Sequence, residues 1–345
     1  MHQLLDITYM GHHSFEEAPV NGATLDDLDL QLVERHISQT LAEGRLRHNE
    51  GAESPRNFLL YHRCVMETDG VLLPTYAGVL FFGRSPQRWM PQAEFVLGHF
   101  PGEKATSQQA RHLQRYGGTL PEQIIAVERY IETHMERGFS LEGGPQRRER
   151  PQFPPVVLRE MLVNAAGHRD YGLTGASIRV SMFPNRIEVA SPGGPPVLAP
   201  LAGLMQASHA RNRVLMRLLW QVRFCEAFGL GLRTIIETML REDLPEPQID
   251  IAAANFFVSI SGHQPTGVNM EIVEKLSEPQ LVLLRAFTRQ GSLTPRQAAG
   301  LLPQRSERSI RNDLNGLVEM GVVIRMGETR AVSYRLANDV LRLPV

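Results

Sequence analysis

The sequence predicts an α+β protein: an α/β sandwich preceded by a helix-rich region and followed by three short helices and a β-hairpin. Several segments repeat apolar residues every three to four positions, which predicts amphipathic helices. In the middle of the chain, a helix is followed by two alternating apolar–polar runs, which excludes a regular series of βαβ units. From Ser277 onward, short segments begin at Ser or Thr and end near Gly or Pro, as short helices do.

Length and composition indicate an ordinary globular protein. The 345 residues are enough for two or three domains. A content of 42% hydrophobic and 21% charged residues is typical of soluble globular proteins. A net charge of −1 gives the whole chain no general attraction to nucleic acid. Cys64 and Cys225 are isolated, so neither a disulfide framework nor a zinc site is indicated. With no secretory signal and no apolar run long enough for a bilayer, we expect a cytoplasmic protein with no membrane partner.

Residues 1–138 are expected to form an N-terminal α/β region that packs on the domain after it. A cap at Thr24 or Asp26, first-turn acids and an apolar face predict a helix over 24–44. A buried helix stopped by Gly83 is expected over 74–83, an amphipathic helix ended by Gly138 over 120–138, and a strand over 93–100. The segment 141–155 is rich in Gly, Pro and Arg without apolar periodicity. We interpret it as a boundary or an exposed loop.

The helix expected over 154–168 carries Glu160, Asn164 and His168 at intervals of four residues among apolar neighbours. Such spacing places the three side chains on one side of the helix, where they either face water or line a pocket. A carboxylate can activate water for attack on a phosphate, and an amide oxygen one turn away can hold Mg²⁺. The spacing alone also occurs by chance. His168-Arg169-Asp170 is expected to end the helix.

Glycines follow at two points that suit phosphate binding. Strands over 176–183 and 186–191 form a predicted hairpin, which leads into a Pro-Gly-Gly turn with Gly193 and Gly194. Further on, Gly229 and Gly231 open another helix, where backbone N–H groups and the helix dipole favour phosphate. A tight turn before a packed helix is the alternative for this second pair. Two more strands, 247–253 and 255–262, complete the predicted sandwich.

This order of helix, hairpin, glycine turn and glycine-opened helix resembles the GHKL ATPase superfamily, which includes the gyrase, histidine-kinase and MutL types. More narrowly, "LREMLVNAAGHRDY", "RIEVASPGG", "ARNRVLMRLL" and "EAFGLGLRTIIETM" resemble the GHKL-like domain of bacterial transcriptional regulators often labelled RecG-like. The resemblance extends upstream to "GATLDDLDLQLVERHI" and "PTYAGVLFFGRSPQRWMPQAEFVLGHFPG". Such proteins often begin with a Schlafen AlbA-type domain that is not recognisable here, so we expect a truncated or naturally short member.

The resemblance implies a GHKL-like nucleotide-binding domain over 139–265 with ATP and Mg²⁺ as ligands. It implies that Glu160 activates water and that Asn164 binds Mg²⁺. By the same resemblance, Gly193 and Gly194 would lie near the base or ribose, and Gly229 and Gly231 would contact phosphates. Arg211 and Asn212 would lie in the lid region near a phosphate. One position departs from the pattern. GHKL ATPases usually place an Asp before the first glycine turn to recognise adenine, whereas Ala190 and Ser191 precede Pro192 here, so base specificity stays open.

After a linker over 266–276, residues 277–345 have the order of a winged helix-turn-helix: three helices, then two strands joined at Gly327. Ten Arg and six acidic residues give this segment a net charge of +4, which leaves −5 for residues 1–276. Basic charge therefore collects where the DNA-binding order of elements occurs. Arg308, Arg311 and Asn312 would face base edges from the recognition helix, and Arg305, Arg325 and Arg330 would neutralise phosphates. A protein-interaction or dimerisation module is the alternative.

Taken together, the sequence predicts a bacterial DNA-binding transcriptional regulator whose GHKL-like domain binds ATP or another nucleotide with Mg²⁺ and adjusts a winged helix on double-stranded DNA. A homodimer is expected, since two related heads match a palindromic site. Hydrolysis is left open, with weak ATPase activity compatible with the pattern. Two alternatives remain: a DNA-dependent ATPase of repair or recombination, and a regulator whose pocket no longer binds nucleotide.

Overall fold

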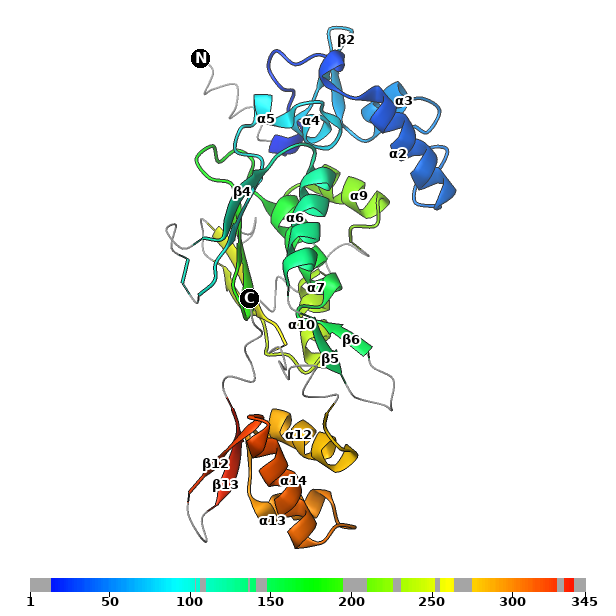
Figure 1. Cartoon of the computed structure of the whole chain (residues 1–345). Coiled ribbons are helices and arrows are strands. Elements are labelled where there is room, and N and C mark those ends of the chain that lie inside the picture. The colour runs from blue at the N-terminus through cyan, green and yellow to red at the C-terminus, as the bar shows by residue number, and fades with distance from the viewer. Residues whose placement is uncertain are drawn as a thin grey trace. The chain divides into compact units, whose positions relative to one another are not determined.

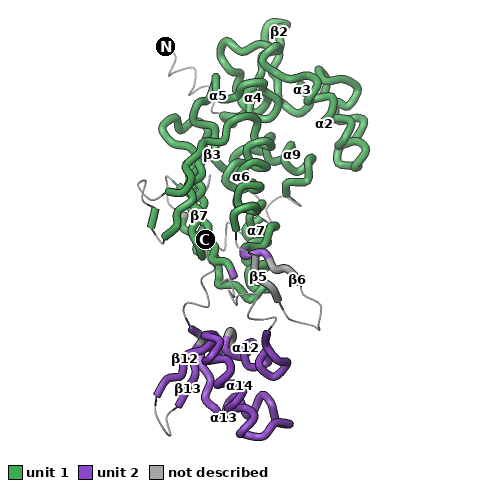
Figure 2. Tube along the Cα trace, viewed as in Figure 1, with its two compact units in different colours: residues 1–135, 153–262 green, residues 136–152, 263–345 purple. Residues whose placement is uncertain are grey.

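The computed structural model describes residues 14–102, 104–105, 110–135, 137–140, 148–194, 210–225, 231–251, 255–263, 275–327 and 332–337 (Figure 1). The chain divides into two compact units (Figure 2). The first comprises residues 1–135 and 153–262, and the second comprises 136–152 and 263–345. The predicted N-terminal region and most of the predicted nucleotide-binding domain therefore belong to one unit.

Short helices and a small hairpin begin the first unit. In chain order these elements are η1 (Phe15–Glu17), η2 (Leu25–Asp27), α2 (Leu30–Ala42), α3 (Pro55–Tyr61), β1 (Val65–Thr68), β2 (Val71–Pro74), α4 (Tyr76–Phe82) and α5 (Pro86–Trp89). The helix predicted over 24–44 is split, because Asp29 caps α2 by accepting hydrogen bonds from the backbone N–H groups of Gln31 and Leu32. As predicted, α4 is buried and ends at Gly83.

A six-stranded mixed sheet forms the centre of the first unit. Its strands are β3 (Phe95–His99), β4 (His112–Tyr116), β7 (Ile178–Met182), β8 (Arg186–Pro192), β9 (Gln248–Ile251) and β10 (Asn255–Ser261), in the order β4-β3-β7-β8-β10-β9. Only β3 and β7 pair in parallel among these described strands. The prediction of strands outside a repeating βαβ pattern is confirmed.

Four helices lie along one side of this sheet: α6 (Leu120–His134), α7 (Pro155–His168), α9 (Arg213–Gln221) and α10 (Gly231–Arg241) (Figure 1). Inward residues of β7 such as Ile178, Val180 and Met182 are buried, while Arg179 between them is exposed. This period of two is the pattern of a sheet covered by helices on one face. The predicted helix 120–138 is shorter in the structure, because β5 (Arg137–Ser140) follows and pairs with β6 (Arg148–Pro151).

The N-terminal elements share one hydrophobic core with the sheet and its helices. A buried carboxylate adds a polar link between them: Glu16 accepts hydrogen bonds from the backbone N–H groups of Val214 (2.9 Å) and Leu215 (3.0 Å). These are free donors at the start of α9, so a residue far away in sequence caps this helix.

The second unit has its own hydrophobic core. Besides β5 and β6, which the division into units places here, its elements are α12 (Glu278–Gln290), β11 (Ser292–Leu293), α13 (Pro295–Leu301), α14 (Glu307–Glu319), β12 (Val323–Met326) and β13 (Ser333–Leu336). The three strands form an antiparallel sheet in the order β11-β13-β12. The three predicted helices and two later strands are present. The two-residue β11 was not predicted, because it is too short to show alternation.

Within the described parts of both units, no helix combines the length and the apolar character needed to cross a bilayer.

Candidate nucleotide site and basic helix

Helix α7 begins at two prolines and is buried on almost every side. Pro155 occupies the first turn, where its missing N–H costs no hydrogen bond. Arg159 reaches outward and forms a two-pronged ion pair with Glu128 of α6, with N–O distances of 3.0 and 2.7 Å. This pair and the apolar neighbours fix the rotation of α7. Glu160 and Asn164 are only 6% and 8% exposed as a result, which argues against a solvated helix face.

The start of α10 lies directly against these two polar side chains. A Cβ atom at Gly231 would lie 2.6 Å from Nδ2 of Asn164 and 2.8 Å from Oε2 of Glu160, so a larger residue here would have to displace these two polar groups. Three of the predicted site residues therefore lie together, although they come from two different helices. The first turn of α10, whose N–H groups have no partner within the helix itself, also brings the positive end of the helix dipole to this point. Gly229 lies outside the described residues.

Asn164 carries an unsatisfied donor within this meeting point. Its Nδ2 is buried and has no hydrogen-bond partner among the described residues. A buried donor without an acceptor is costly, so the arrangement favours a bound group that supplies one. The negative charge of Glu160 reaches the neighbouring Cys225: burial first, and Glu160 second, raise the pKa of that thiol to about 12. The thiol therefore stays protonated at neutral pH, and it is not a thiolate nucleophile.

The first glycine turn lies on the far end of α7. Gly193 has a φ of +97°, and a Cβ there would lie 2.5 Å from Cβ of Asp170, so glycine is required for two reasons. The backbone N–H of Asp170 donates to the carbonyl oxygen of Pro192 at 2.9 Å. The hydroxyl of Ser191 is buried and donates to the carbonyl oxygen of Ala165 at 2.8 Å. The hydroxyl hydrogen of Ser191 is therefore already used in a hydrogen bond to α7.

Arg211 connects this turn to the end of α7. Its guanidinium donates to Oδ2 of Asp170 at 3.0 Å and to the carbonyl oxygen of Gly194 at 2.8 Å. The side chain is 27% exposed, so it is accessible to a ligand. Burial, together with the nearby charge of Arg211, lowers the pKa of His168 to about 4. His168 is therefore neutral at pH 7 and brings no positive charge to the stripe.

Asn212 holds the last turn of α7. It is 2% exposed, and its Nδ2 donates to the carbonyl oxygens of Gly167 (3.0 Å) and Arg169 (2.8 Å). A phosphate contact by this amide stays a prediction, and its observed partners are backbone atoms. As expected, the residues after His168 end the helix, with the fully buried Arg169 donating to the carbonyl oxygen of Leu173. Sequence reasoning missed Asp170 as a partner of the glycine turn, because no local spacing links them.

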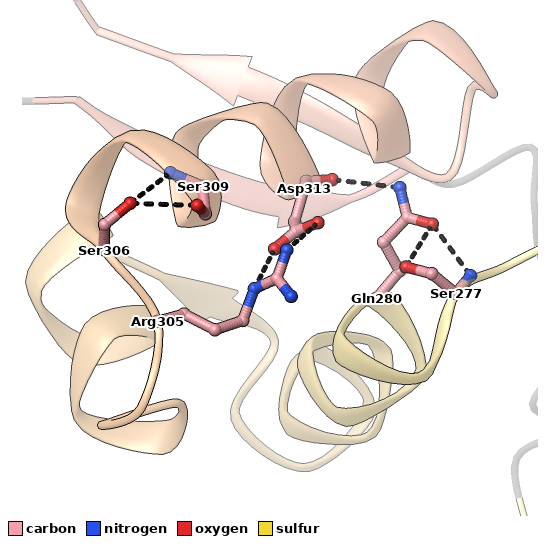
Figure 3. Close-up of polar contacts among 6 residues, drawn as sticks. All are labelled: Ser277, Gln280, Arg305, Ser306, Ser309 and Asp313. Atoms are coloured by element: carbon pink, nitrogen blue, oxygen red, sulfur yellow. Dashed lines mark hydrogen bonds and ion pairs between the residues drawn. The ribbon is translucent and has the colours of Figure 1, made fainter.

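In the second unit, the predicted recognition helix is α14. Arg308, Arg311 and Asn312 are exposed on it, and Arg325 is exposed on β12, whereas Arg330 lies outside the described residues. Arg305 differs from the other cations because it is already paired: its Nε lies 3.0 Å from Oδ2 of Asp313 (Figure 3). With 38% of its side chain exposed, Arg305 still reaches solvent, so a phosphate contact by it stays a prediction.

Comparison with known proteins supports part of this description. Residues 175–260 match a family model described as "Putative ATP-dependent DNA helicase recG C-terminal". The matched segment contains both glycine positions, but it begins after Glu160 and Asn164. The crystal structure of the DIP2311 protein from Corynebacterium diphtheriae is similar with a TM-score of 0.58 and 18% identity, over 98% of this chain and 67% of that one. At this identity the likeness shows the fold alone. A search of curated proteins found no match.

Proposed function

We propose that the chain binds ATP or another nucleotide together with Mg²⁺ in a GHKL-like domain, and that this binding modulates a DNA-binding winged helix. The observation that carries the nucleotide part is the meeting of Glu160, Asn164 and Gly231. An acid, an amide and a glycine-opened helix end are the groups that activate water, hold Mg²⁺ and receive phosphate. The family match over the glycine segments supports the same assignment.

The chemistry of the donors suits Mg²⁺ shared with phosphates rather than a closed protein cage. Among the described residues, no three His, Cys, Asp or Glu side chains are placed to hold a metal ion. Mg²⁺ is commonly bound by one or two protein oxygens, with phosphates and water completing its shell. Asn164 would supply such an oxygen, and the charge of the metal would offset the repulsion between Glu160 and a polyphosphate.

The order of elements in the second unit supports the DNA-binding part. One helix, a short strand, two helices and a two-stranded hairpin, with the first strand joining the hairpin, is the order of a winged helix. The outward side chains of α14 combine Arg and Asn, which bind guanine and adenine edges in the major groove. We propose double-stranded DNA as the partner and a homodimer as the binding form.

The test of the nucleotide part is calorimetric titration of the full chain with ATP and Mg²⁺, for the wild type and for Asn164→Ala. We expect binding by the wild type and at least a tenfold loss in the variant, because the amide oxygen is removed. Thr238→Ala, at a buried polar position later in α10, is the matched control and should bind as the wild type does. Absence of binding to the wild type at millimolar ATP would refute the proposal and favour a pocket without nucleotide.

A second candidate is a DNA-dependent ATPase of repair or recombination. The description of the matched family, which names a DNA helicase, favours it. Glu160→Gln separates the two, because glutamine keeps the shape of the side chain but cannot accept a proton from water. A sensor should retain nucleotide-dependent DNA binding in this variant. An ATPase should lose phosphate release, and with it the biological function.

A further inference from the structure

A fourth polar side chain continues the outward stripe of α14. Asn315 is exposed, and it follows Arg308 by seven residues, Arg311 by four and Asn312 by three. These intervals place all four side chains on one face of the helix. The first three are the residues of this helix that the sequence predicts to face base edges, and Asn315 is additional to them.

The packing of α14 fixes which of its faces is turned outward. Ile310, Leu314 and Leu317 are at most 2% exposed and anchor the opposite face in the core of the unit. Gly316 lies close to α12, since a Cβ there would lie 2.6 Å from the side-chain end of Gln280, at Nε2. Gln280 is itself held by the capping box at Ser277, which Figure 3 shows beside α14. The helix therefore has little freedom to rotate.

The acid in the middle of α14 is kept away from this stripe. Asp313 is 8% exposed, and both of its carboxylate oxygens face the guanidinium of Arg305, at 3.0 and 3.3 Å (Figure 3). Its charge is thus compensated within the unit. The exposed acids of α14, Glu307 and Glu319, lie near its two ends. Between them the outward stripe presents two guanidinium groups and two amides.

We propose that Asn315 is a specificity-determining residue that contacts adenine, so that α14 reads a half-site containing both guanine and adenine. This inference rests on the proposed DNA-binding function. An Asn amide donates to and accepts from the N7 and N6 edge of adenine, and Arg pairs with the O6 and N7 edge of guanine. From position 308 to 315 the helix rises about 10 Å at ~1.5 Å per residue. That length covers about three base-pair steps of ~3.4 Å.

The test begins with selection of duplexes from a randomised pool by the full-length protein. Affinities are then measured by fluorescence anisotropy for the selected duplex and for each single base-pair change. In Asn315→Ala, we expect discrimination at one A·T position to fall by roughly 5- to 140-fold, with other positions unchanged. Asn315→Asp should move the preference at that position away from adenine, because a carboxylate cannot donate to N7. Asn57→Ala, an exposed change on α3, is the matched control.

The outcomes separate this inference from the proposal on which it depends. Circular dichroism and thermal unfolding confirm first that each variant is folded. If the wild type binds duplexes selectively and Asn315→Ala keeps every base preference, Asn315 is not a specificity determinant while DNA binding stands. If the wild type selects no duplex, DNA binding by α14 and the role of Asn315 both fall.

Discussion

The two polar stripes of this protein, one on α7 and one on α14, differ in how the fold treats them. Glu160 and Asn164 are almost completely buried and touch the start of another helix, whereas Arg308, Arg311 and Asn312 remain exposed. Both stripes have similar helical spacing in the sequence. Spacing therefore indicates a shared face, and the tertiary packing decides whether that face encloses a small ligand or meets a large partner.

The largest effect is expected at Gly231. In Gly231→Ala, the added Cβ would lie within 3 Å of the side-chain ends of Asn164 and Glu160, so these two groups must leave their positions to admit it. We expect loss of measurable ATP binding by calorimetry and a lower Tm. Gly300→Ala on α13, where no atom lies within 4 Å of the new Cβ, should leave both unchanged or raise the Tm slightly. Equal ATP affinity in Gly231→Ala and the wild type would separate α10 from the nucleotide site.

The buried carboxyl group of Glu16 should make the stability of the first unit depend on pH, which the exposed stripe of α14 should not do. Burial raises the pKa of Glu16 from about 4.5 to about 7. Between about pH 4.5 and 7, Glu16 keeps its proton in the folded state but has lost it in the unfolded state. The free energy of unfolding should therefore fall as the pH rises from about 4.5 to 7, and it should be constant above that range. For a shift of this size the change is about 3 kcal/mol.

Chemical unfolding of the wild type and of Glu16→Gln between pH 4.5 and 8 tests this expectation. The glutamine side chain does not titrate, so the variant should lose this part of the slope. An unchanged slope in the variant would assign the pH dependence to other groups.

Among the exposed arginines of the second unit, we expect two kinds of DNA contact. Arg311→Ala should weaken binding to the preferred duplex by about 1–3 kcal/mol and relax one base preference, because this side chain faces base edges. Arg325→Ala, on the hairpin, should weaken binding equally for all duplexes and reduce the slope of log K against log salt by about 1. Anisotropy titrations at several salt concentrations measure both. Identical behaviour of the two variants would contradict base reading by α14.

The smallest effect is expected at the ion pair between Arg305 and Asp313. This pair is partly exposed, so replacing Asp313 by Asn should cost about 1 kcal/mol or less in the unfolding of the second unit. Thermal unfolding at low and high salt measures it, and the difference between variant and wild type should shrink at high salt. A difference that does not depend on salt would indicate that Asp313 acts mainly through packing.

Local patterns predicted the elements well where one helix or strand carries its own signal. The apolar face of α6, the alternation of β7 and β8, and the glycine at the start of α10 were all visible in the sequence. The burial of Glu160 and its contact with Gly231 could be expected only from the resemblance, since the two positions are far apart in the chain. The partnership of Asp170 with Gly193 and Arg211 could not be predicted, because it depends on how three segments meet in space.

The parallel pairing of β3 with β7 has a practical consequence for studies of this protein. Residues 175–260 match a family model, yet their sheet is continued by β3 and β4, which come from before residue 120. A fragment with those limits would leave the backbone N–H and C=O groups on one side of β7 without their partner strand. Such unpaired edge strands tend to pair with strands of other molecules and so promote aggregation. Fragments intended for crystallography or domain grafting should therefore start upstream of Phe95, so that they contain β3 and β4 as well as the later strands of this sheet.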